Sequence, residues 1–296
     1  MRRFLKAFFT TILVIIILFV GSTFYYLFKN HIENPGNILS EIKNSDNQVE
    51  FLLLGVDSLD SSTATNTRTD TIMVVKLDLE NGNASLVSVP RDTYTAIQGH
   101  KAQKINAAYN FGGPELTLDT VNNLLGTDIK HYLVMDYGFV EDMVNIIGGV
   151  TVDVPMKMDY EDTWADPPLK IHLEPGVQKL NGNEAIQFLR FRHGYVNQDL
   201  GRVEAQRQFV SAFMDKIKSP TTILKAPLLL KSYDKYTRSN MPFSEIIKIG
   251  MNMRKFSTDS ISSETLPGAA GYRNRVSYFF VNKAKTAKLI QELGIN

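Results

Sequence analysis

Apolar and polar positions fall into blocks that predict strands and helices over most of the chain. Residues 51–56 are almost wholly apolar, which is typical of a short central strand buried on both faces. The Asn81-Gly82 pair lies between two more apolar runs and is a hairpin signal. Strands are expected at 51–56, 71–77, 84–89, 131–135, 150–154 and 276–281, and helices at 115–125, 139–147, 183–191, 201–218, 222–230, 243–256 and 283–293. This mixture favours a single domain of the α/β (α+β mixed) class, with a central mixed β-sheet flanked by helices.

A long apolar segment near the N-terminus predicts a membrane anchor. From Ala7 to Phe28 no side chain is formally charged, and at about 1.5 Å rise per residue a helix of this length spans roughly 33 Å. Arg2, Arg3 and Lys6 precede it, so the positive-inside rule places the N-terminus in the cytoplasm. We expect a cytoplasmic tail (1–6), a single transmembrane helix (7–28), a polar stalk (29–47) and an extracellular domain (48–296) with its motifs in about 51–218.

A cleaved signal peptide is the alternative for this segment. It is less favoured, because the apolar run is longer than a usual signal core and the bulky residues 25–28 make a poor cleavage site.

The charge balance and the absence of cysteine exclude several kinds of function. The chain has 32 basic and 31 acidic residues, and three of the basic ones lie before residue 7. The remainder is therefore slightly acidic and lacks the broad basic field that nucleic acids require, so no nucleic-acid partner is expected. With no cysteine, disulfides, thiolate catalysis and Cys-ligated metals are excluded.

Two aspartates lie where strands are expected to end or begin. Asp57 directly follows the 51–56 run, and Asp70 directly precedes the strand expected at 71–77. Converging carboxylates at strand ends would form a site for a hard cation, and Mg²⁺ usually takes one or two carboxylates together with phosphate oxygens. For either aspartate alone, a turn or capping role is the alternative.

Arginines recur near other element ends. Arg91 follows Pro90 at the end of a strand, and Arg190 and Arg192 are two residues apart, so both can act on one ligand only if the helix ends near Phe191. Arg202 and Gln206 share a helical face, whereas Arg207 is rotated by about 140° from Arg202. Each arginine alone can be a surface residue or a salt-bridge partner. Together with two aspartates they fit a phosphate-plus-metal site, since guanidinium binds phosphate in a bidentate manner.

Several ordered motifs resemble those of the LytR-CpsA-Psr family. They are Leu54-Gly55-Val56-Asp57, Arg68-Thr69-Asp70-Thr71, Ser88-Val89-Pro90-Arg91-Asp92-Thr93-Tyr94, Lys104-Ile105-Asn106-Ala107-Ala108-Tyr109 with Gly112-Gly113, Ile147-Gly148-Gly149-Val150, Leu180-Asn181-Gly182-Asn183-Glu184-Ala185 and Arg190-Phe191-Arg192. The resemblance implies a cell-wall phosphotransferase that moves a glycopolymer (teichoic acid, capsule or similar) from a polyprenyl-pyrophosphate lipid in the membrane to a peptidoglycan sugar hydroxyl, forming a phosphodiester.

The resemblance also implies roles for individual residues. Asp57 and Asp70 would bind Mg²⁺, with Mn²⁺ as a substitute, and the pyrophosphate would be surrounded by Arg68, Arg91, Arg190, Arg192, Arg202 and Gln206. Asp92 would lie in the same site, either as the base for the acceptor hydroxyl or to orient Arg91. Ala205 and Leu59 depart from the family pattern, since relatives often have basic residues there.

A carrier lipid needs an apolar slot, and two other functions stay open while a third conflicts with the expected topology. The candidate wall residues, which could equally be ordinary core, are Val121, Leu124, Leu125, Phe139, Val140, Met143, Val144, Ile146 and Ile147. A pyrophosphatase or phosphatase would use the same groups with water as acceptor, and a non-catalytic lipid- or glycan-binding module would not need the aspartates. A transcriptional regulator needs a cytoplasmic DNA-binding element, for which the expected six-residue tail leaves no room.

Overall fold

The computed structural model describes residues 46–56, 69–162, 169–191, 194, 199–217, 219–223, 225–252 and 255–295. The chain packs as two compact units. The sheet unit comprises residues 44–137, 236–245 and 255–296, and the helix unit comprises residues 138–235 and 246–254 together with 1–43. No helix among the described residues is long and apolar enough to cross a membrane, and the segment 7–28 lies outside them.

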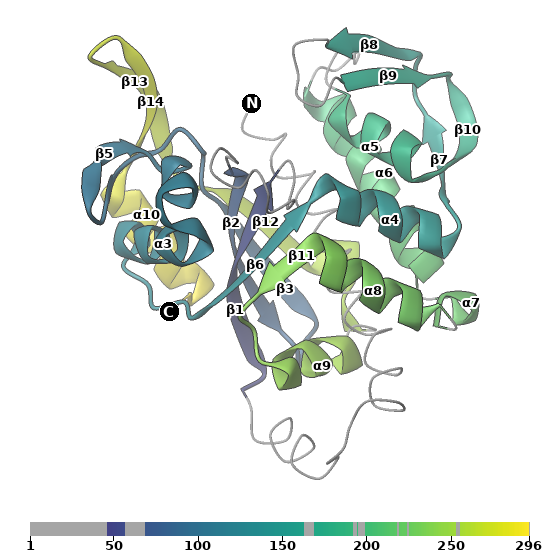
Figure 1. Ribbon diagram of the computed structural model, residues 1–296, viewed down its shortest axis with the longest axis horizontal. Coiled ribbons are helices and arrows are strands. Elements are labelled where there is room, and N and C mark those ends of the chain that lie inside the picture. Colours follow the sequence, from purple (N-terminus) through teal and green to yellow (C-terminus); the bar gives the residue numbers. More distant parts are fainter. Residues whose placement is uncertain are drawn as a thin grey trace. The chain divides into compact units, whose positions relative to one another are not determined.

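The sheet unit is built on a six-stranded mixed β-sheet in the order β11-β6-β1-β2-β3-β12 (Figure 1). The strands are β1 (Gln48–Val56), β2 (Thr69–Asp78), β3 (Asn83–Ser88), β6 (His131–Asp136), β11 (Thr237–Ser239) and β12 (Ile261–Thr265). β1 pairs parallel with β6 and antiparallel with β2, and β12 pairs parallel with β3. The structure thus confirms the predicted mixed sheet, with the apolar run at 51–56 in an interior strand and a β2–β3 hairpin at Asn81-Gly82.

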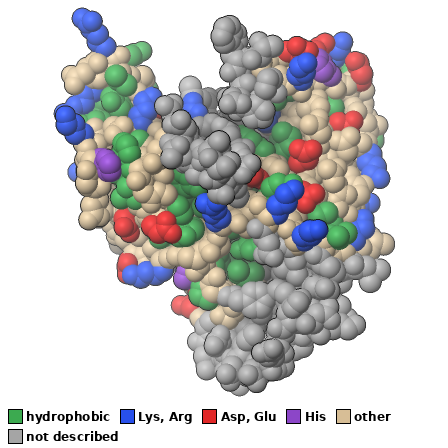
Figure 2. Space-filling model, viewed as in Figure 1, with side chains coloured by type: hydrophobic (Ala, Val, Ile, Leu, Met, Phe, Trp, Pro, Cys, Tyr) green, Lys and Arg blue, Asp and Glu red, His purple; other side chains and the backbone are tan. Residues whose placement is uncertain are grey.

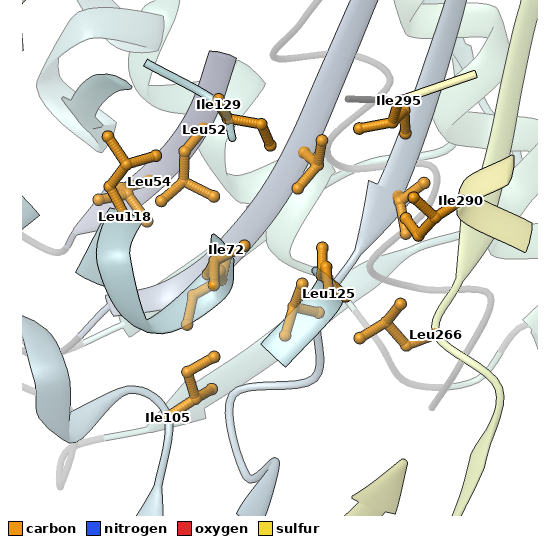
Figure 3. Close-up of a cluster of buried hydrophobic side chains, with 14 of the residues drawn as sticks. Leu52, Leu54, Ile72, Ile105, Leu118, Leu125, Ile129, Leu266, Ile290 and Ile295 are labelled. Carbon is orange, nitrogen blue, oxygen red and sulfur yellow. The ribbon is translucent and has the colours of Figure 1, made fainter. Parts of the chain in front are cut away.

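One face of this sheet is buried beneath helices α3 (Ala107–Leu125) and α10 (Lys283–Leu293). Alternate residues of β1 and β2, among them Leu52, Leu54 and Ile72, pack with Leu118 and Ile290 from the two helices (Figure 3). Every second side chain of a strand points to the same face of the sheet, and side chains three or four residues apart share one face of a helix. A core between a sheet and helices needs apolar residues at both sets of positions.

Helix α3 begins earlier than the sequence pattern predicts. Its first residues, from Ala107, are separated from the rest by a kink at Gly112 and Gly113, which adopts φ +67°, followed by Pro114. The predicted start at 115 therefore corresponds to the point at which regular helix resumes, because Pro favours the first turn of a helix.

Two small hairpins complete the sheet unit. One consists of β4 (Tyr94–Ile97) and β5 (His100–Lys104), and the other of β13 (Gly268–Arg273) and β14 (Val276–Val281). The structure confirms a strand at 276–281, whereas β4, β5, β12 and β13 were not predicted because their exposed faces obscure the apolar alternation.

The helix unit combines helices with two antiparallel strand pairs, β7–β10 and β8–β9. Its strands are β7 (Val150–Val154), β8 (Met158–Asp162), β9 (Leu169–Leu173) and β10 (Gly176–Leu180), and its main helices are α4 (Tyr137–Ile147), α5 (Gly182–Arg190) and α6 (Asp199–Ile217). The rings of Phe188, Phe209 and Phe213 are fully buried and stack in succession, with centroids 6.2 and 6.3 Å apart. They join α5 to α6 and form the core of this unit.

The prediction of one helix at 222–230 was wrong. The structure has a short helix, α7 (Pro220–Ile223), and a second helix, α8 (Ala226–Tyr236), separated by a break at which the Lys225 ammonium donates to the carbonyl of Ile146, 2.8 Å away at the end of α4. The helix predicted to end at 256 is α9 (Phe243–Asn252).

Candidate functional site

The end of β1 pairs with the start of β2, next to one of the two predicted metal-binding positions. Gly55 pairs with Thr71 and Val56 with Thr69, so Asp70 is the additional residue of a β-bulge at the end of this strand pair. Asp57 follows Val56 in the sequence and lies outside the described residues, as does the side chain of Asp70. The register therefore places Asp70 beside the point at which the chain leaves β1 toward Asp57.

Close packing of β1 against β2 explains why position 55 is a glycine. A Cβ atom there would lie 2.7 Å from both Cβ and Oγ1 of Thr71 on the paired strand, so no larger residue fits without moving the strands apart. Glycine in a strand interior is typical of such close approach beside a bulge. The Leu54-Gly55-Val56-Asp57 motif is thus explained up to its last residue by packing of β1 against β2.

The residue types predicted for this place suit a hard cation. Carboxylate oxygens are the ligands that Mg²⁺ prefers. Thr69, fully buried next to Asp70, has a hydroxyl without a hydrogen-bond partner. Among the described side chains no group of three or more His, Asp or Glu residues could hold a metal, and neither aspartate of the predicted pair is among those side chains.

Arg91 and Asp92 occupy the two central positions of a β-turn directly after β3. The amide of Thr93 donates to the Pro90 carbonyl at 2.9 Å, and the Thr93 hydroxyl donates to the same oxygen at 2.6 Å. Pro90 occupies the first position of this turn. The side chains at the two central positions project outward, and Arg91 is exposed. The turn thereby presents a guanidinium and a carboxylate at the end of the sheet.

The carboxylate of Asp92 forms an ion pair with Lys104 of β5, with Nζ and Oδ1 2.6 Å apart. The Asp92 carbonyl accepts a hydrogen bond from the amide of Phe279 on β14 at 2.9 Å. Lys104 was not predicted as a site residue, although it begins one of the motifs quoted above. The structure gives it a specific role, because it holds the side chain of Asp92 from the neighbouring hairpin.

The predicted end of the helix before Arg192 is confirmed. Helix α5 ends at Arg190, and Phe191 is its C-cap with extended backbone (φ −64°, ψ 130°) and a buried ring. Its other end is fixed by a capping box, in which the Asn181 side chain accepts from the Glu184 amide at 3.0 Å and the Asn181 amide donates to the Glu184 carboxylate at 2.8 Å. Arg190 is half-buried, and Arg192 lies outside the described residues.

Helix α6 carries the remaining predicted positions. Ala205, Phe209 and Phe213 are buried and mark its packed face. Arg207 is exposed. The side chains of Arg202 and Gln206, like the whole of Arg68, are outside the described part of the chain.

The candidate residues divide between the two units. Asp57, Arg68, Asp70, Arg91 and Asp92 belong to the sheet unit, and Arg190, Arg192, Arg202 and Gln206 to the helix unit. The apolar candidates for a lipid slot divide in the same way: Val121 and Leu125 lie in the core of the sheet unit, whereas Phe139, Val140, Met143, Val144 and Ile147 are buried side chains of α4. Each group is accounted for by ordinary core packing.

Two tyrosines and a histidine of the sheet unit titrate unusually. Burial and the hydrogen bond that the Tyr132 hydroxyl donates to the Glu115 carboxylate, at 2.7 Å, together raise the pKa of Tyr132 to about 12. Burial also raises the pKa of Tyr109. The hydrogen bond to Glu245 raises the pKa of His131. None of these groups belongs to the predicted site, and both tyrosines remain neutral donors at physiological pH.

The fold and the site define an α/β protein that presents arginines and acidic positions where strands and a helix end. The chain belongs to the LytR_cpsA_psr family, whose profile matches residues 27–294.

Among its relatives, the polyisoprenyl-teichoic acid–peptidoglycan teichoic acid transferase TagU of Bacillus licheniformis is 29% identical over 99% of this chain and 96% of its own length. TagV of Bacillus subtilis, named for the same activity, is 29% identical over 88% of this chain and 68% of its own. Regulatory protein MsrR of Staphylococcus aureus is 31% identical over 79% of this chain and 68% of its own.

Solved structures show the same fold. The crystal structure of B. subtilis TagV superposes with a TM-score of 0.62 and 28% identity, covering 84% of this chain and 98% of that one. The structure of TagT bound to LIIa-WTA superposes with a TM-score of 0.61 and 27% identity, covering 85% and 92% respectively.

Proposed function

We propose that this protein transfers a glycopolymer from a polyprenyl-pyrophosphate carrier lipid to a sugar hydroxyl of peptidoglycan. The membership of the family and the names of its relatives support this assignment. The structural observation that carries it is the end of the β1–β2 pair, where the bulge at Asp70 lies beside the strand that leads into Asp57. The reaction class needs positioned charge more than covalent chemistry from the protein, and these residues supply such charge.

The atoms of the proposed transfer balance without a further reactant. The acceptor hydroxyl oxygen forms a bond to the phosphorus that carries the polymer. The bond from this phosphorus to the bridging oxygen of the pyrophosphate breaks, and polyprenyl phosphate leaves. The hydroxyl proton passes to a base or to water, and the product is a phosphodiester between polymer and peptidoglycan.

Asp57 and Asp70 are proposed to hold Mg²⁺, with Mn²⁺ as a substitute. The support is the carboxylate chemistry of the pair, the bulge at Asp70 and the position of Asp57 directly after β1 in the sequence. When bound, the ion neutralises charge on the phosphates.

The arginines are proposed to bind the pyrophosphate, namely Arg68, Arg91, Arg190, Arg192 and Arg202, with Gln206 as a neutral partner. Arg91 is presented by the β-turn and Arg190 by the last turn of α5. A planar guanidinium matches two phosphate oxygens and stabilises charge on the leaving phosphate. Since Lys104 engages one carboxylate oxygen of Asp92, we assign Asp92 a positioning role at the turn in preference to that of general base.

The location proposed for this reaction is the outer face of the cell membrane. The support is the uncharged segment 7–28 with its preceding basic residues, which we interpret as a single-pass anchor with the N-terminus in the cytoplasm. Protease added to wall-stripped cells should then digest the domain, whereas full protection would contradict the proposed topology.

The test of the proposed function is transfer of labelled polymer by the full chain in detergent micelles. Asp57→Ala and Asp70→Ala should each abolish transfer while the circular dichroism spectrum stays unchanged, and EDTA should abolish it in the wild type. Arg207→Lys is the matched control, since this exposed residue on α6 should tolerate the change. A non-catalytic binding module predicts that both aspartates are dispensable, and equal activity with EDTA and with Mg²⁺ would contradict the metal assignment.

A further inference from the structure

The two small hairpins of the sheet unit form a continuous surface whose residues have no role in the proposed chemistry. Thr93, just before β4, forms a parallel bridge with Phe279 of β14. Tyr94 of β4 packs edge-on against Tyr278, with ring centroids 5.0 Å apart, and lies 5.8 Å from the ring of Phe280. We call Tyr94, Arg273, Tyr278 and Phe280 the aromatic face.

The register of the hairpin fixes which side chains share this face. Arg273 pairs with Val276 and Gly271 with Tyr278, so these residues project to the same side as Phe280. A Cβ atom at Gly271 would lie 3.0 Å from the Phe280 ring, which shows that the ring packs directly over the glycine. The three rings are partly exposed and are held in place by their mutual contacts.

The charged side chains of the two hairpins are all cationic, and the nearest acidic one in the sequence, Asp92, is paired with Lys104. Residues 93–104 and 268–281 contain no Asp or Glu, and they include Lys101, Arg273 and Arg275. The Arg273 guanidinium lies over the Tyr94 ring, 4.6 Å from its centroid, so a cation is fixed on the aromatic face. Figure 2 shows Lys and Arg side chains beside hydrophobic ones over the protruding β13–β14 hairpin at upper left.

This face adjoins the catalytic turn. Tyr94 follows directly on Thr93, which closes the turn that presents Arg91 and Asp92, and the Phe279 amide donates to the Asp92 carbonyl at 2.9 Å. Aromatic rings offer apolar faces on which the C–H side of a sugar ring packs, and arginine pairs with anionic substituents. A surface with both properties beside a phosphate-transfer site fits a charged glycan.

We propose that the aromatic face binds the glycan chain of an anionic wall polymer next to the reacting group. That polymer is the peptidoglycan acceptor, whose glycan strand is a chain of pyranose rings that carries carboxylate groups. The proposal rests on the proposed function for the source of the glycan. The site itself rests on the rings, the arginine and the charge of the two hairpins.

The hairpin supplies its own control. Tyr272 is 81% exposed but pairs with Ser277 and therefore lies on the opposite face from Tyr278. Tyr272→Ala removes an equally large aromatic ring from the same strand pair without touching the aromatic face. Arg275→Ala likewise removes an exposed cation at the tip, two residues beyond the arginine that lies over the Tyr94 ring.

The experiment measures binding of the full chain in nanodiscs to soluble uncrosslinked peptidoglycan strands, to poly(glycerol phosphate) and to neutral dextran. Tyr278→Ala and Arg273→Ala should each weaken binding of the peptidoglycan strands about tenfold, the size of one stacking contact or one charged hydrogen bond. Tyr272→Ala and Arg275→Ala should change it less than about twofold, and dextran should bind weakly throughout. Poly(glycerol phosphate) is anionic but has no sugar ring, so its binding should not depend on Tyr278. Loss of its binding in Tyr278→Ala with peptidoglycan binding unchanged would overturn the proposal.

Equal effects of Tyr278→Ala and Tyr272→Ala, or binding unaffected by either, would overturn the proposal. A third outcome would also overturn it. If no glycan binds, and phosphatidylglycerol vesicles capture the wild-type nanodiscs but not those with Tyr278→Ala, the aromatic face is a membrane-binding surface. Transfer activity is measured in parallel. If Tyr278→Ala binds glycan as the wild type does while Asp70→Ala abolishes transfer, the aromatic face is refuted but the transferase is not. If Tyr278→Ala weakens glycan binding while the wild type shows no transfer, the transferase is refuted but the aromatic face is not.

Discussion

Arginine is presented in two different ways in the two units of this protein. In the sheet unit, the turn that carries Arg91 is held by hydrogen bonds: Thr93 donates twice to Pro90, and the Asn106 amide donates to the Arg91 carbonyl at 3.3 Å. In the helix unit, the end of α5 that carries Arg190 is held by burial of Phe188, Leu189 and Phe191. The first depends on directional polar contacts and the second on apolar packing, so different substitutions should disable them.

The largest effect is expected for Phe191→Ala. The Phe191 ring is 3% exposed, and deleting a buried phenylalanine side chain lowers the free energy of unfolding by about 3–5 kcal/mol. Thermal unfolding followed by circular dichroism should therefore show a markedly lower Tm, with loss of transfer. A Tm close to wild type would show that burial does not hold the end of α5, and the contrast between the units would fail.

Arginine-to-lysine changes should have the next largest effect. Arg91→Lys and Arg190→Lys keep the charge but lose the planar fork, which costs about 1.5–3 kcal/mol of transition-state stabilisation for a charged hydrogen bond, or roughly 10- to 150-fold in kcat/KM. Arg207→Lys should be nearly silent. If Arg207→Lys proved as damaging as Arg91→Lys, then Arg207 would be the substitute for the arginine that relatives often have at Ala205.

Thr93→Val tests the hydrogen bonds of the turn. The change removes the hydroxyl that donates to Pro90 and should lower the free energy of unfolding by about 1 kcal/mol, with a loss of transfer because the turn loosens around Arg91.

Asn181→Ala removes the capping box of α5 and should lower the free energy of unfolding by about 1 kcal/mol as well. Because the capping box is at the far end of α5 from Arg190, Asn181→Ala should leave kcat/KM nearly unchanged, and equal loss of activity in both variants would contradict this distinction.

The smallest expected effect is a pH dependence confined to the sheet unit. Glu245, 3.4 Å from His131, raises the folded-state pKa of this histidine above its ordinary value of 6.5. The contribution to stability is therefore fully present below pH 6.5 and is lost as the pH rises through the folded-state pKa. It should amount to less than about 1 kcal/mol for this partly exposed pair. Glu245→Gln should flatten the dependence of Tm on pH in this range, and an unchanged slope would contradict the pairing.

The sequence predicted the apolar strands and the amphipathic helices well, because burial determines both. β1, β2, β6, β7, α4 and α10 lie close to their predicted bounds. The short strands at the surface could not be predicted, since β8 and β13 have largely exposed side chains and their pairing depends on contacts distant in the sequence. The break between α7 and α8 was missed for a similar reason, as it depends on a contact from Lys225 to the end of α4.

The candidate site was predictable in part. The helix end at Phe191 followed from the need to present two arginines two residues apart, and the structure confirms it. The bulge at Asp70 and the pairing of Lys104 with Asp92 were not predicted, because strand register and ion pairs between hairpins leave no periodic signal in the sequence. All the predicted site roles remain predictions, namely those of Asp57, Arg68, Asp70, Arg91, Asp92, Arg190, Arg192, Arg202 and Gln206.

Product analysis of the purified full chain tests the central claim most directly. The chain is incubated with polyprenyl-pyrophosphate-linked polymer, with or without uncrosslinked peptidoglycan, and the products are resolved by ³¹P NMR and mass spectrometry. The account predicts polyprenyl phosphate together with a new phosphodiester on peptidoglycan, formed when acceptor is present and lost in Arg91→Lys. Release of free polymer phosphate at the same rate with and without acceptor, and no phosphodiester, would identify a hydrolase and contradict the account.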